Sequence, residues 1–237
     1  MRQNGSFLAF DTSTDVMSIA LTNGERVWQH TGPGGAKAST SLIPAVLALL
    51  AQARLQLADL QAIAFGRGPG SCTGLRTACA VAQGLAFGSG QHGIPVLPID
   101  TLMAVAEEAR FQKETPHITA LLDARMEEMY VQQFAWLNGK LNPLADADLM
   151  RPEQLAFDDT TLYAGNVFEV YRGRLPDHLN GLTCLPTATA MLRLAPGLAA
   201  SGQCVPAAQA LPLYVRDKVA LTTVEREHIK AAKLHAT

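Results

Sequence analysis

A glycine-rich turn leads directly into a helix of small residues between Gly66 and Gly88, where the sequence reads GRGPGSCTGLRTACAVAQGLAFG. The short apolar run Ala62–Phe65 before this turn predicts a buried strand, and residues Thr73–Phe87 after it predict the helix. Ser71 is placed to cap that helix through its side-chain oxygen. A strand, a glycine turn and a helix in this order are typical of an α/β protein.

The alternating glycines Gly66, Gly68 and Gly70 would let backbone amides approach a phosphate closely. However, the turn fits neither the GxxxxGK[ST] phosphate loop nor the GxGxxG dinucleotide fingerprint. Ser71 does not lie in GxSxG, so the turn is no nucleophile elbow. We retain Gly68 and Gly70 only as candidates for a vestigial nucleotide cleft.

Two helices carry the residues of a candidate partner interface. The first, predicted over Ser39–Leu55, is apolar around more than one face; either Ser39 or Ser41 caps it, or it begins earlier and Pro44 kinks it. The second presents small residues at every fourth position. These stripes favour either packing on the chain's own sheet or a seam with another subunit. The candidate interface residues are Leu42, Val46, Leu50, Gly74, Ala78, Ala82 and Ala86.

The first half of the chain reads as three strands followed by alternating helices and strands. The first three strands are expected over Phe7–Phe10, Val16–Thr22 and Glu25–His30, and Asn23-Gly24 predicts a type I′ hairpin turn between the last two. Further on, a strand is expected over Ile94–Ile99, then a helix over 102–111 capped by Asp100 or Thr101. This alternation implies parallel pairing, as in a ribonuclease H-like lobe.

The second half resembles a faint repeat of the first. The segment LDARMEEMYVQQ aligns with FDTSTDVMSIAL at a constant offset of 112 residues, which pairs Asp123 with Asp11. In both copies an apolar strand ends in Asp before a tight turn, and Asn138-Gly139 closes a second predicted hairpin. Chance similarity of two hairpins is the alternative, but duplication predicts the two ribonuclease H-like lobes of the actin/hexokinase/Hsp70-like (ASKHA) fold.

We therefore expect an N-terminal lobe over 1–112, a C-terminal lobe over 113–218, and a terminal helix or flexible tail over 219–237. In a two-lobed fold of this kind, Asp11 and Asp123 would face a cleft suited to nucleotide phosphates and a metal ion. A carboxylate at a strand end, however, more often caps its own turn. Both residues are candidates for the vestigial nucleotide cleft.

Composition narrows the classes of function. The net charge of −2 lacks the basic excess that phosphate contacts require, so direct tRNA binding is disfavoured. The six histidines form no HxxxH or HExxH pair, which leaves no metal ligands in that pattern. The four cysteines fit reduced thiols, and a nucleophile at Cys72 or Cys79 would require a base that the sequence does not show. With no leader pattern and no apolar run long enough for a membrane span, we expect a cytoplasmic protein.

The chain resembles the TsaB (YeaZ) family in its motifs LAFDTST, GRGPGSCTGLR, IDTLMAVAEEA, LLDARMEEMYVQQF and PLYVRDK. The resemblance covers Phe7 to Lys218, and GRGPGSCTGLR and DARMEEMY are its most specific motifs. One departure concerns the first long helix, which in the family often opens with a His-Ser or His-Thr pair. Ala38 and Ser39 hold the matching positions here, so any role for that histidine is absent.

The resemblance implies a non-catalytic scaffold or activator in bacterial tRNA threonylcarbamoyladenosine synthesis. Such a chain would dimerise with the catalytic paralogue TsaD, work with the TsaE-like ATPase, form homodimers when alone, and meet tRNA only indirectly. It would carry no catalytic residue, no metal and no cofactor of its own. Any ATP or ADP and Mg²⁺ would bind at the complex interface. The alternative is an independent nucleotide-binding phosphotransferase or ATPase of the actin-like fold, whereas a metalloprotease lacks its ligands here.

Overall fold

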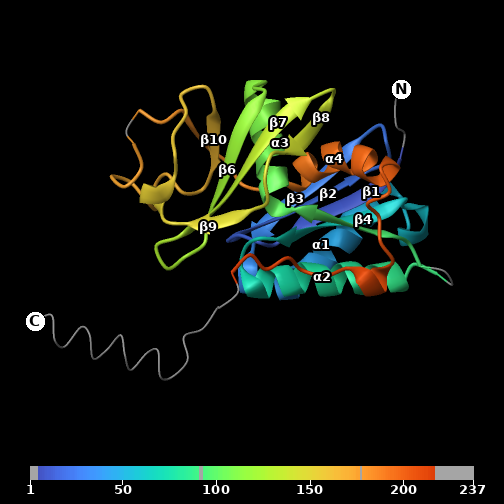
Figure 1. Ribbon diagram of the computed structural model, residues 1–237. Helices are drawn as coiled ribbons and strands as arrows, with labels where there is room; N and C mark the ends of the chain where they lie inside the picture. The colour runs from blue at the N-terminus through green and yellow to red at the C-terminus, as the bar shows by residue number, and fades with distance from the viewer. Residues whose placement is uncertain (1–4, 91–92, 177, 217–237) are drawn as a thin grey trace, which may run out of the picture.

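Two β-sheets with the same strand order form the framework of the protein (Figure 1). The structure is a computed structural model that describes residues 5–90, 93–176 and 178–216. The first sheet has the order β3-β2-β1-β4-β5. Its strands are β1 (Phe7–Asp11), β2 (Val16–Thr22), β3 (Val27–Pro33), β4 (Ala62–Gly68) and β5 (Val96–Asp100).

The second sheet repeats this plan. Its order is β11-β10-β6-β7-β8, with β9 paired to β7. In both sheets the first strand pairs antiparallel with the next strand of the chain and parallel with a later one. The strands are β6 (His117–Asp123), β7 (Met129–Leu137), β8 (Lys140–Pro143), β9 (Asp148–Met150), β10 (Leu162–Gly165) and β11 (Gly181–Thr183). The matching order supports the predicted duplication.

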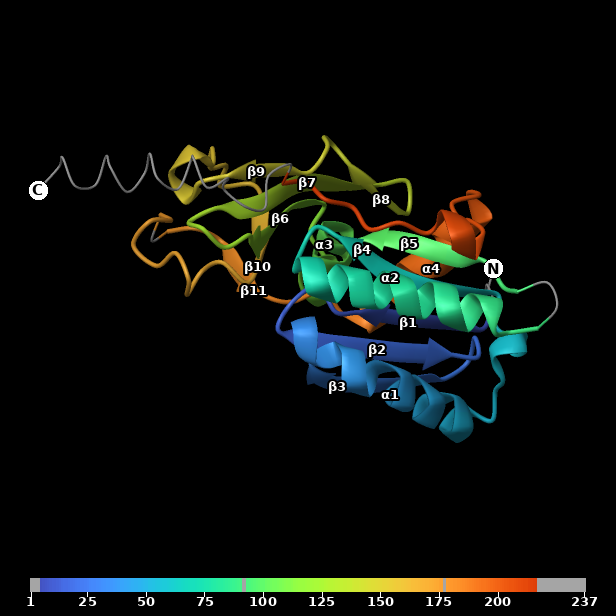
Figure 2. The same ribbon diagram turned by 90° about the horizontal axis from the view of Figure 1, so that it is seen from below.

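The helices form two layers around the first sheet (Figure 2). The outer layer, α1 (Ala38–Ala53) and α2 (Cys72–Phe87), covers one face, where α1 packs on β2 and β3 and α2 packs on β4. The inner layer, α3 (Thr101–Lys113) and α4 (Ala188–Ala200), packs in the core that joins the two sheets. The second sheet lacks counterparts of α1 and α2 within the described residues; an apolar cluster that includes Leu155 covers its far side.

The predicted elements before β6 are confirmed in type and order. Two local details are wrong. The third strand begins at Val27, because the Asn23 side chain accepts hydrogen bonds from the amides of Glu25 and Arg26 at 3.0 and 2.9 Å. Only Gly24 of that loop has a positive φ, so the loop is not a type I′ turn.

The helix starts also differ in part from the prediction. Neither Ser39 nor Ser41 caps α1, which begins at Ala38 after a short 3-10 turn and places Pro44 inside the helix. Ser71, by contrast, accepts a hydrogen bond from the Gly74 amide and caps α2 as predicted. The Asn138-Gly139 turn is confirmed, since both residues have positive φ and the flanking residues pair.

The expected tail, 219–237, lies outside the described residues. The connection between the sheets falls between the end of α3 and the start of β6, close to the predicted boundary at 112. However, α4 and the segment after it return to the first sheet, where Val205 pairs with Val96. The division into separate domains at that boundary stays a prediction.

Candidate functional site

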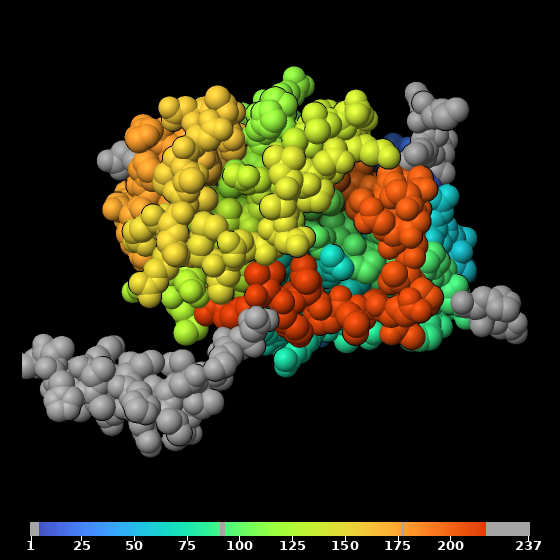
Figure 3. All heavy atoms as spheres, in the orientation of Figure 1, coloured from blue at the N-terminus to red at the C-terminus, as the bar shows by residue number. Residues whose placement is uncertain are grey.

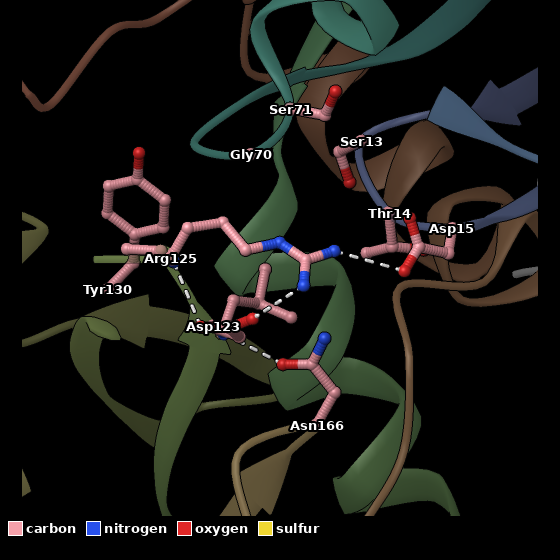
Figure 4. Close-up of a pocket in the computed structure, with 11 residues that line it drawn as sticks. Ser13, Thr14, Asp15, Gly70, Ser71, Asp123, Arg125, Tyr130 and Asn166 are labelled. Atoms are coloured by element: carbon pink, nitrogen blue, oxygen red, sulfur yellow. Dashed lines mark hydrogen bonds and ion pairs between the residues drawn. The ribbon is translucent and has the colours of Figure 1, made fainter. Parts of the chain in front are cut away.

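The ends of β1 and β6 open onto a cleft between the two lobes, with a volume of about 180 Å³ (Figure 4). The β1–β2 loop contributes Ser13, Thr14 and Asp15 on one side, and the start of α2 contributes Gly70 and Ser71. The β6–β7 turn and the end of β10 supply the other side. The lining residues from this second lobe are Leu122, Asp123, Ala124, Arg125, Tyr130 and Asn166.

A guanidinium group lies between the two carboxylates of the cleft. Arg125 Nη2 is 3.2 Å from Asp15 Oδ2, and Arg125 Nη1 is 3.5 Å from Asp123 Oδ2 (Figure 4). A metal-bound phosphate would need these carboxylates free to hold the cation. In this structure the two carboxylates are paired with a cation of the chain itself.

Asp123 is held by the turn that it ends. Its Oδ1 accepts hydrogen bonds from the Arg125 amide at 2.9 Å and from the Tyr171 hydroxyl at 2.8 Å, while its own amide donates to Asn166 at 2.8 Å. Burial, together with the neighbouring Asp123 carboxylate, raises the pKa of Tyr171 above its ordinary value. The carboxylate therefore organises the β6–β7 turn, which is the simpler of the two predicted roles.

Asp11 does not reach the cleft. Its side chain is fully buried, and its Oδ1 accepts hydrogen bonds from the Ser13 amide at 2.9 Å and from the Ser13 hydroxyl at 2.6 Å. Oδ2 has no hydrogen-bond partner among the residues described. Burial raises the pKa of this carboxyl to about 6, although the Ser13 bonds act in the opposite direction. Asp11 is a structural acid beneath the β1–β2 loop.

Of the four residues predicted for the cleft, the structure brings two together. Asp123 and Gly70 line it, whereas Asp11 lies below it and Gly68 lies under Leu213. Sequence reasoning missed Arg125. The signal was present in the internal repeat, because the 112-residue offset aligns this arginine with Ser13 and so places a cation where the first copy has a small hydroxyl.

The seven predicted interface residues all face inward. Every one is buried in the chain's own core, so none can contact a partner in the folded protein. Gly74 shows why its stripe is small: a Cβ there would overlap the Thr12 carbonyl oxygen, and the Thr12 hydroxyl donates to the Gly74 oxygen at 2.7 Å. The small residues therefore let α2 approach the β1–β2 loop and the first sheet, which corrects the subunit-seam interpretation.

The outward face of α1 and α2 is nonetheless apolar. Ile43 and Leu47 on α1 are 42% and 52% exposed, and Phe87 at the end of α2 is 63% exposed. Gly84, also on α2, faces open space, since a Cβ at this position would meet no atom within 4 Å. The stretch Gly35–Ala53 is long and apolar enough to cross a membrane by length and composition alone, yet its buried side chains pack on the first sheet as in a core helix.

The other candidate chemistries find little support. Within 5–90, 93–176 and 178–216, no group of three or more His, Cys, Asp or Glu side chains could hold a metal ion. All four cysteines are free. Burial raises the pKa of the Cys79 thiol, which donates to the Ala210 carbonyl oxygen at 3.2 Å. A thiol in this position is not activated as a nucleophile.

Comparisons with known proteins agree with this geometry. The chain is 33% identical to the Haemophilus influenzae tRNA threonylcarbamoyladenosine biosynthesis protein TsaB, over 92% of this chain and 96% of that protein. The chain belongs to the TsaB family. The Escherichia coli TsaB is 31% identical over 90% of this chain and 95% of that protein.

The structural comparison gives the same family. YeaZ from Pseudomonas aeruginosa superimposes with a TM-score of 0.80 at 34% identity, covering 89% of this chain and 99% of that one. Residues 30–220 also match the family model of the tRNA N6-adenosine threonylcarbamoyltransferase TsaD. This TsaB-family protein therefore has the predicted two-lobed actin-like fold and acts in tRNA threonylcarbamoyladenosine biosynthesis.

Proposed function

We propose that this chain is the non-catalytic scaffold of a bacterial threonylcarbamoyladenosine synthesis complex. It would pair in the cytoplasm with the catalytic TsaD-like paralogue and work with a TsaE-like ATPase. The observation that carries the proposal is Arg125, whose guanidinium lies between the carboxylates of the interlobe cleft. An ion pair of the chain's own residues at this place supports a contribution through assembly, and nucleotide with Mg²⁺ would bind at the complex interface.

The proposed pairing surface is the outer face of α1 and α2, which we define as Ile43, Leu47, Ala80, Gly84 and Phe87. These residues point away from the core on two adjacent helices. Only 28% of the most apolar stretch of the first helix is buried in the monomer. Because covering one large apolar side chain contributes about 1.5–3 kcal/mol, three such side chains can anchor a subunit contact. The same face would form the homodimer when the chain is alone.

Gly84→Arg tests the pairing surface without disturbing the fold, because a side chain at this position meets open space. We expect the variant to stay folded, to lose its complex with the TsaD-like paralogue in size-exclusion chromatography with light scattering, and to abolish tRNA modification in the reconstituted system. The matched control is Gly197→Arg on α4, a second helical glycine with nothing nearby. An unchanged complex with Gly84→Arg would remove α1 and α2 from the interface.

The second candidate is an independent nucleotide-binding phosphotransferase or ATPase. It is favoured by the start of α2, since Gly70 and Ser71 line the same cleft as Asp123. Calorimetry of the isolated chain with ATP and Mg²⁺ distinguishes the two functions. Binding at micromolar nucleotide, weakened by Asp123→Asn, would favour the enzyme; no heat at millimolar nucleotide favours the scaffold. The net charge of −2 further supports an indirect relation to tRNA, which a salt-sensitive gel shift of the isolated chain would contradict.

A further inference from the structure

The segment after α4 runs back across the molecule and contacts both lobes. Residues 203–216, which we call the strap, pass along α2 and end beside the β6–β7 turn (Figure 1). In the space-filling view the strap forms a continuous band between α2 and the second lobe (Figure 3). None of its contacts is required by the scaffold role, so they call for a separate explanation.

The strap is bonded to the first lobe along α2 and β4. The Ala210 carbonyl oxygen accepts from Cys79 Sγ at 3.2 Å and from Gln83 Nε2 at 3.0 Å. Further along, the Leu213 amide donates to the Arg67 carbonyl oxygen at 2.7 Å. These bonds hold the strap at two points, so its end is delivered to a fixed place beside the cleft.

At the end of the strap, the Arg216 side chain binds the β6–β7 turn of the second lobe. Its side chain is only 12% exposed, and its Nη2 lies 2.8 Å from Glu128 Oε2. The same nitrogen is 3.1 Å from the Ala124 carbonyl oxygen and 3.3 Å from the Arg125 carbonyl oxygen. The second terminal nitrogen, Nη1, lies 2.9 Å from Met126 Sδ, so the guanidinium contacts the turn through both of its terminal nitrogens.

The β6–β7 turn has an unusual backbone. Arg125, Met126 and Glu127 follow one another with φ values of 60°, 55° and 63°. Left-handed conformation costs each non-glycine residue about 1–2 kcal/mol, so three in a row need compensation from outside the turn. Arg216 supplies it, because it neutralises Glu128 and binds two of the turn's carbonyl oxygens.

A second direct tie across the cleft is weak. Arg125 and Asp15 are 72% and 89% exposed, and exposed ion pairs contribute about 0–1 kcal/mol. On the far side the core around α3 and α4 joins the lobes, so any change in the cleft would occur at the side where the strap lies. We propose that the strap is an interlobe latch, held to the second lobe by Arg216. The latch fixes the opening of the cleft and the shape of the β6–β7 turn. This inference stands independently of the scaffold function.

The test compares the full chain with its Arg216→Gln variant. Spin labels on unnatural amino acids at Glu25 and Asp159, one exposed loop residue in each lobe, report the interlobe distance without using the native cysteines. Hydrogen exchange measures the protection of the Ala124 amide, which donates a hydrogen bond to the Glu128 carbonyl oxygen at 2.9 Å. We expect a distance distribution broadened by about twofold and faster exchange confined to the turn.

Two further variants keep the proposal testable if Arg216→Gln does not fold. Arg216→Lys retains the charge opposite Glu128 but loses the second nitrogen, which contacts Met126 Sδ, so an intermediate broadening is expected. Leu213→Pro removes the amide donor that ties the strap to the Arg67 carbonyl oxygen, and it should also broaden the distance distribution. Arg172→Gln, which breaks an exposed ion pair elsewhere, is the control that should leave both readouts unchanged. An unchanged distance distribution, or faster exchange throughout the protein, would overturn the latch.

Discussion

Asp11→Asn should make the protein more stable at neutral pH, although it removes a carboxylate that ends the first strand. The folded protein raises the pKa of Asp11 from 3.8 to about 6, mainly because the side chain is fully buried. The difference between these two pKa values corresponds to about 3 kcal/mol. The side chain is wholly inside the protein, so solvent screening does not reduce this figure.

The sign of the effect depends on which state ionises first. Below pH 3.8 the carboxyl is protonated in both states and burial carries no charge penalty. As the pH rises above 3.8, Asp11 ionises first in the unfolded chain, so the folded state loses stability. Above the folded-state pKa of about 6, Asp11 is ionised in both states and the loss stays constant. Asparagine avoids the charge penalty and keeps an oxygen to accept both Ser13 hydrogen bonds, while its amide nitrogen takes the place of Oδ2 and adds a cost that does not vary with pH.

Urea unfolding followed by tryptophan fluorescence at pH 4, 5, 6 and 7 measures the effect. The difference in unfolding free energy between Asp11→Asn and the native sequence should increase by about 2–3 kcal/mol between pH 4 and pH 7. Asp146→Asn removes an exposed carboxylate instead and should change stability by less than about 0.5 kcal/mol. A difference that does not vary with pH would refute the assignment of a buried, penalised carboxylate.

Three other predictions concern packing and buried polar contacts, and each is checked by the same urea titration at pH 7. Gly74→Ala should lower the unfolding free energy by about 2–3 kcal/mol, because its Cβ would meet a backbone oxygen. Gly84→Ala should raise it by about 0.5–1 kcal/mol, because its Cβ would face open space. Equal effects would contradict the close approach of α2 to the β1–β2 loop at Gly74. Glu107→Gln should cost about 3 kcal/mol, because this side chain, 2% exposed, faces guanidinium groups of both α3 and α4; a cost no larger than that of Glu169→Gln on the surface would exclude the buried network. Tyr171→Phe should cost about 1–2 kcal/mol through its lost hydroxyl bonds, and no change would mean that they contribute nothing.

The elements of the first lobe could be predicted because each has a strong local signal. Apolar runs ending in Asp marked the buried strands, and Ser71 marked the start of α2. The Asn-Gly turns show the limit of such signals. Asn138-Gly139 adopts the predicted conformation, but the Asn23 side chain binds two amides of its own loop and shifts the next strand.

The candidate site was predicted only in part. The internal repeat correctly related Asp11 to Asp123, and both residues accept a hydrogen bond from the amide two positions ahead at 2.9 Å. Their different exposure could not be predicted, because it depends on what covers each turn. The start of the β1–β2 loop is covered by α2 through the Thr12–Gly74 hydrogen bond, whereas the β6–β7 turn opens onto the cleft and carries Arg125 into it.

By itself, the sequence determined the order of strands and helices, the duplication and the family, because hydrophobic periodicity, turn residues and motif spacing are local properties of the chain. Only the tertiary structure decided which faces point outward. The stripe of Gly74 and Ala78 turned inward, and Ile43 and Leu47 turned outward. When a helix is apolar on several faces, its sequence is compatible with burying any of them. Packing against the sheet determines which face is buried.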